Sequence, residues 1–137
     1  MCYILYGAMD RSVNIRDYDR ASQRHTYRFP LGTRHDVKMC ILNNGDAFRV
    51  TDWICDCDFP VGKGDEHAPE LKDLAGLILE LKQTRDAKCL YLTKVWNGKR
   101  NGKEVTVHVD DMDLIPFLAN MEENCLYRID LYPRFQT

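Results

Sequence analysis

The sequence predicts an α+β fold in which two helices pack on one face of a mainly antiparallel sheet. Three patterns predict this fold. Apolar and polar residues alternate over 50–58, apolar residues recur at helical spacing after Pro69, and two Asn-Gly pairs lie within 97–102, between two apolar runs. The chain has 137 residues, 45% of them hydrophobic, and a net charge of −2, which is the composition of one domain with its own core.

The first element of this core is expected to be a strand over 50–58, because side chains of two kinds alternate there. The apolar and thiol-bearing face would comprise Trp53, Cys55, Cys57 and Phe59. The opposite face would comprise Asp52, Ile54, Asp56 and Asp58. A helix is expected after a turn-rich stretch, because Pro69 suits a first helical position. Its buried side would comprise Leu71, Leu74, Ala75, Ile78 and Leu81.

The rest of the chain predicts a hairpin, a second helix and a last strand. Strands over 87–96 and 103–109 flank the loop with the two Asn-Gly pairs. Asp113 can begin a short helix, whose apolar stripe comprises Leu114, Phe117, Leu118 and Met121. A strand over 125–132 follows. The order from about residue 50 onward is therefore strand, helix, strand, strand, helix, strand, which is the ferredoxin-like, split βαβ arrangement.

We expect a single domain over 1–137, with a βαββαβ core over 50–133 and an N-terminal strand extension over 1–49. The extension is expected to contain strands over 2–8, 37–43 and 25–29 and a short helix over 15–24. The pattern does not indicate how these strands pair with the sheet.

The charge balance and the N-terminal run exclude several classes of protein. The chain carries 19 basic and 21 acidic residues, which argues against coating nucleic acid by bulk charge. The apolar run over 2–9 has no basic leader and is too short to span a bilayer. We therefore expect a cytoplasmic protein without a nucleic-acid or membrane partner, whose six cysteines remain thiols. The oligomeric state stays open.

Cys55 and Cys57 form the one cysteine pair that raises a chemical question. At strand spacing they would present two thiolates on one face and could bind zinc, with His67 or another cysteine completing the site. The chain lacks the paired ligand spacing of a structural zinc site, so we favour the interpretation that both are core residues. No metal and no cofactor are predicted.

Asp56 and Asp58 form a carboxylate pair, and a second acidic cluster lies over 110–113. The predicted strands would place the two clusters at opposite ends of the sheet, so they would not share a metal ion. The second cluster is better explained as the acidic start of a helix. The loop over 61–65, which contains Lys63, lies between a strand and a helix, where backbone amides can bind a phosphate. We expect any ligand pocket beside this loop, near Asp56, Asp58 and His67.

Arg16, Arg20 and Arg24 recur every four residues and would form one stripe on a helix. Guanidinium groups in a row suit phosphate or an acidic protein surface. Because Asp17 and Asp19 lie between them, a solvated face neutralised by local carboxylates is the alternative. A second basic group is interpreted as a solubilised loop tip and strand edge, and it comprises Lys94, Lys99, Arg100 and Lys103.

These patterns predict a small non-enzymatic binding module of inhibitor, immunity or regulatory type, which recognises a protein partner or a small anionic ligand. The candidate binding residues are Arg16, Arg20, Arg24, Lys63, Asp56, Asp58 and His67. The alternative is a metal- or thiol-dependent enzyme, centred on Asp56, Asp58, His67 and Cys57. We place binding first because no catalytic constellation emerges from the residue spacing.

Overall fold

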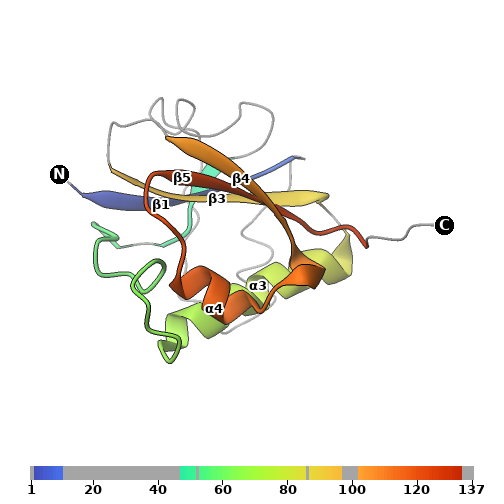
Figure 1. Cartoon of the computed structure of the whole chain (residues 1–137), viewed down its shortest axis with the longest axis horizontal. Helices are drawn as coiled ribbons and strands as arrows, with labels where there is room; N and C mark the ends of the chain where they lie inside the picture. Colours follow the sequence, from blue (N-terminus) through green and yellow to red (C-terminus); the bar gives the residue numbers. More distant parts are fainter. Residues whose placement is uncertain (1, 11–46, 52, 86, 97–101, 134–137) are drawn as a thin grey trace.

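The computed structural model describes residues 2–10, 47–51, 53–85, 87–96 and 102–133. The elements are β1 (Tyr3–Met9), β2 (Ala47–Arg49), α3 (Pro69–Thr84), β3 (Cys89–Trp96), β4 (Lys103–His108), the short 3₁₀ helix η1 (Val109–Asp111), α4 (Leu114–Ala119) and β5 (Cys125–Asp130) (Figure 1). The elements expected over 15–24, 25–29 and 37–43 lie outside the described residues.

The strands form one mixed sheet in the order β2-β1-β3-β5-β4. β1 pairs antiparallel with β2 and β3, and β3 pairs antiparallel with β5. β4 pairs with β5 in parallel. The expected α+β class is confirmed. The first strand lies inside the sheet, since β1 has a neighbour on each side.

Both helices lie on one face of this sheet (Figure 1). The helix expected after Pro69 is confirmed, and its buried side comprises Leu71, Leu74, Ala75, Leu77, Ile78 and Leu81. These side chains belong to one apolar core with Leu5, Leu92 and Ile129 of the sheet. The second helix is also confirmed, with Asp113 at its N-cap position but without a capping hydrogen bond from the side chain.

The opposite face of the sheet is also buried at its centre. The buried side chains there come from β1, β3 and β5 and comprise Ile4, Tyr6, Ala8, Cys89, Tyr91, Val95 and Leu126. Interior strands that are buried on both faces have nearly continuous apolar sequences. The runs that begin at Tyr3 and Cys89 have this character, which explains their place in the middle of the sheet.

The ferredoxin-like arrangement is not confirmed, because the predicted hairpin partners are not neighbours. β5 lies between β3 and β4. β3 is buried along nearly its whole length, whereas β4 is exposed or half-buried throughout. A strand with that exposure suits an edge, and the segment from η1 through α4 is long enough to connect β4 to a parallel neighbour. The Asn-Gly pairs therefore predicted a chain reversal but not the partner of the strand.

The strand expected over 50–58 is wrong. The described part of this segment consists of turns, a bend and irregular backbone. The predicted pattern of burial also fails at its centre, since Asp56, which the alternation assigns to the polar face, is 0% exposed, whereas Trp53, which it assigns to the apolar face, is 36% exposed. The reason is that the Asp56 carboxylate binds the backbone of β1, which requires this side chain to point inward.

Candidate functional site

Residues 55–57 run beside the start of β1 and are attached to it by three hydrogen bonds. The Asp56 N–H donates to the Tyr3 carbonyl at 3.0 Å. The Tyr3 N–H donates to Cys57 Sγ at 3.3 Å, although these residues are 54 positions apart in the sequence. The Leu5 N–H donates to Asp56 Oδ2 at 2.8 Å. The attachment places a short loop at a defined position on the first strand.

The Asp56 carboxylate is buried and fully engaged. Besides the Leu5 amide, it accepts a hydrogen bond from the Thr51 hydroxyl, and Arg49 Nη2 lies 3.2 Å from Oδ2. A buried carboxylate needs such charged and hydrogen-bonding partners, because its desolvation is costly. Asp56 therefore holds the loop in place, and its oxygens are occupied by the protein itself.

Lys94 fixes the same loop from the neighbouring strand β3. Its side chain is buried, and Nζ donates to the carbonyls of Phe59 at 3.0 Å, Val61 at 2.9 Å and Cys57 at 3.5 Å. Burial lowers the pKa of this ammonium group, and the charge of Lys63 lowers it further, while Glu123, Asp56 and Cys57 oppose the shift. The assignment of Lys94 to an exposed basic group is wrong, because the lysine lies within a buried strand.

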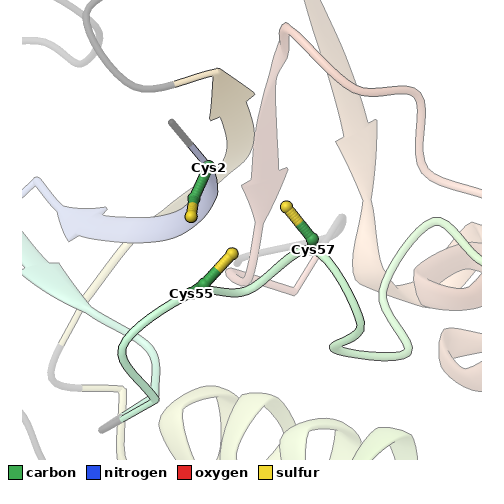
Figure 2. Close-up of side chains that lie close together, drawn as sticks. All are labelled: Cys2, Cys55 and Cys57. Carbon is green, nitrogen blue, oxygen red and sulfur yellow. The ribbon is translucent and has the colours of Figure 1, made fainter.

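Three thiols converge between this loop and the residue before β1. The sulfur atoms of Cys2, Cys55 and Cys57 all lie within 4.8 Å of one another (Figure 2). All three side chains are partly exposed, and the thiols are free. The interpretation of Cys55 and Cys57 as core residues is therefore wrong.

This spacing is close to that of a metal-thiolate site. Zn–S bonds of about 2.3 Å place two sulfur ligands of a tetrahedral ion about 3.8 Å apart. The three sulfur atoms need to approach by no more than about 1 Å to reach that separation. Within the part of the chain that the structure describes, no fourth histidine, cysteine or carboxylate joins the three cysteines.

The other predicted site residues are not part of this cluster. Asp58, Lys63 and His67 are exposed, and none of them belongs to the group of cysteines. Arg16, Arg20 and Arg24 lie outside the described residues.

The loop over 61–65 does not present all its amides to a ligand. The Gly62 N–H donates to the Leu118 carbonyl at 2.9 Å, and the Gly64 N–H donates to the Ala119 carbonyl at 2.7 Å. Both glycines have positive φ, and a Cβ at Gly62 would lie 2.8 Å from the Met121 carbonyl oxygen. The loop uses these two amides to dock on the end of α4.

The second acidic cluster serves a different part of the fold. The Asp110 carboxylate accepts a hydrogen bond from Lys82, in the last turn of α3, at 2.6 Å. Its backbone N–H donates to His108 Nδ1 at 3.1 Å. Asp110 therefore links the end of β4 to the end of α3.

The structure places two residues differently from what the sequence indicates. Cys2, which falls at the start of the strand expected over 2–8, lies directly before β1 and is partly exposed. Lys94 was assigned to the surface, although it lies between Thr93 and Val95 in a run that is otherwise apolar. A lysine inside such a run indicates a buried ammonium group that binds several carbonyls.

The chain matches no protein-family model, no curated protein and no solved structure. In the described ranges, no helix has both the length and the apolar character needed to cross a membrane. The chemistry of the thiol cluster is therefore the basis for assigning a function.

Proposed function

We propose that this protein is a non-enzymatic binding module that holds a thiophilic metal ion, first of all zinc, at Cys2, Cys55 and Cys57. The observation that supports it is the convergence of three free thiols, from segments far apart in the sequence, within 4.8 Å. Thiolates are the preferred ligands of zinc and copper(I) in proteins. Partial exposure gives an ion access to all three sulfur atoms.

The surroundings of the thiols suit a complex of three thiolates with a divalent ion. The Tyr3 N–H already donates to Cys57 Sγ, and such hydrogen bonds orient a thiolate ligand and tune its donor strength. Three thiolates and one Zn²⁺ carry a net charge of −1, and the Lys94 ammonium contributes +1 close to Cys57. The buried lysine thus compensates the charge of the complex.

Binding explains this arrangement better than catalysis does. In many hydrolytic metal sites a general base lies beside the ion and activates its bound water. The Asp56 oxygens are occupied by Leu5, Thr51 and Arg49. Asp58 and His67 do not belong to the described thiol cluster. We therefore rank the enzyme centred on Asp56, Asp58, His67 and Cys57 second.

The test is a titration of the reduced full chain with Co²⁺, a spectroscopic substitute for Zn²⁺, followed by competition with Zn²⁺. We expect one ion per chain, thiolate-to-cobalt charge-transfer bands, and displacement by zinc. Cys2→Ser and Cys57→Ser should each weaken binding at least tenfold, because each removes a ligand. Circular dichroism verifies that the variants are folded.

Cys125→Ala and His67→Ala are the matched controls. Cys125 is a buried thiol outside the cluster, and His67 is the exposed histidine that the sequence suggested as a ligand. Both variants should bind cobalt like the parent chain. Equal binding by Cys2→Ser and the parent chain would contradict the proposed function.

The wider prediction is that the module recognises a protein partner or a small anionic ligand in the cytoplasm. Lys63 supports an anionic ligand, since its exposed side chain adds positive charge near Lys94.

A further inference from the structure

The number of thiols in the cluster indicates how many coordination positions of the ion the described residues fill. Zinc in proteins is nearly always four-coordinate, and closed structural sites supply all four ligands from side chains. Sites with three protein ligands leave the fourth position to water or to an exchangeable ligand. In the described part of this chain the cluster stops at Cys2, Cys55 and Cys57.

Resting on the proposed function, we propose that the ion at Cys2, Cys55 and Cys57 keeps one coordination position open, and that a small monodentate anion binds the ion there. All three cysteines are partly exposed, so a ligand from solvent can reach the ion. Of the two carboxylates next to Cys57 in the sequence, Asp56 is buried and bound by other groups, and Asp58 does not belong to the cluster, so neither fills this position in the structure.

The charges that act on Lys94 and on the cluster nearly balance. Zn²⁺ and three thiolates give −1, and Lys94 and Lys63 give +2. Glu123, whose charge also acts on Lys94, and the exposed Asp58, next to Cys57 in the sequence, give −2. Asp56 is neutralised by Arg49. The sum is −1, so the bond to the metal ion, and not the surrounding charge, holds the anion.

The experiment uses the full chain loaded with one Co²⁺, whose visible spectrum reports each ligand. Sodium azide is added, and sodium perchlorate at the same ionic strength serves as the control. We expect a saturable change of the d–d bands with azide and none with perchlorate, at unchanged cobalt content. An identical response to both salts would overturn the open position while leaving the metal site intact. A chain that does not bind cobalt through Cys2 would contradict the proposed function itself.

Lys63→Met tests whether the exposed charge that acts on Lys94 also attracts the anion. Removing one exposed charge should weaken azide binding about two- to fivefold and leave cobalt binding unchanged. Lys72→Met, which removes an exposed charge on α3, is the matched control and should bind azide like the parent chain. Equal azide affinities in the two variants would overturn the contribution of Lys63 to the anion site.

Discussion

The interface between the helices and the sheet is held together differently from the loop that carries Cys55 and Cys57. At the interface, fully buried apolar side chains such as Leu74 and Ile78 pack against Leu92. The loop is held by two buried charged groups, Asp56 of the loop itself and Lys94 of β3, each with several hydrogen-bond partners.

The difference explains why the candidate site lies in the loop. Apolar contacts are not directional, so they stabilise a fold without fixing the orientation of a single backbone group. Charge-assisted hydrogen bonds are directional and hold the backbone on both sides of Cys57. A binding site needs that precision, since its ligands must be oriented before the ion arrives.

The largest effect is expected from breaking the polar attachment of the loop. Asp56→Ala leaves the Arg49 charge and the Leu5 amide without their partner, and such losses cost about 3–5 kcal/mol. Urea unfolding measures the free energy of unfolding. Asp58→Ala, two residues away and exposed, should change it by less than about 0.5 kcal/mol. Equal effects of the two variants would refute the role of Asp56.

Breaking the apolar interface should cost about 2–5 kcal/mol. Leu74→Ala removes a fully buried side chain from α3 and leaves a cavity. Leu79 lies on the same helix but is 50% exposed, so Leu79→Ala should be nearly neutral. The comparison uses the unfolding midpoint of both variants. Leu74→Ala should leave cobalt affinity unchanged at low temperature, since it does not touch the loop.

Lys94→Met should cost about 1–3 kcal/mol, because the Phe59 and Val61 carbonyls lose their buried donor. It should also weaken cobalt binding, since the loop is no longer fixed. Lys103→Met, at an exposed ion pair with Glu122, is the control and should be nearly neutral.

The same variant tests the effect of pH. The folded pKa of Lys94 is lowered by burial, so between this value and its ordinary value the unfolded chain binds the extra proton. The contribution of Lys94 to stability therefore rises as the pH increases through that window. Lys94→Met lacks this rise. Burial raises the pKa of Cys89 and Tyr91 in both proteins, so the informative quantity is the difference between them.

The smallest effect is expected at Ile54, which is 95% exposed in spite of its apolar side chain. Ile54→Ser should change the free energy of unfolding by less than about 0.5 kcal/mol. Ile78→Ser, on the buried side of α3, should destabilise the protein by several times more. A large loss in Ile54→Ser would contradict the exposed position of this side chain.

The sequence predicted the elements that depend on apolar burial. The helix after Pro69, the short helix after Asp113 and the strands near 89–96 and 125–130 all have repeating apolar positions, and all are present. Strand neighbours were not predicted correctly, because the pattern within β4 indicates an edge but does not name its partner.

The candidate site was predicted only in part. The pair Cys55 and Cys57 stood out in the sequence. Their burial was inferred from an alternation of apolar and polar side chains that does not hold here, because the Asp56 carboxylate is buried. Cys2 joins them because β1 lies inside the sheet beside residues 55–57, a proximity that no local spacing encodes. Long-range contacts of this kind are fixed by the tertiary structure alone.

The position of Cys2 at the start of β1 has a mechanical consequence. An ion shared by Cys2 and Cys55 would act as a removable cross-link across about 50 residues of chain. It would stabilise the folded chain because the ion binds only where the fold brings the cysteines together, and chelation would remove that stabilisation at once. The stability of the whole sheet would then follow the supply of free metal.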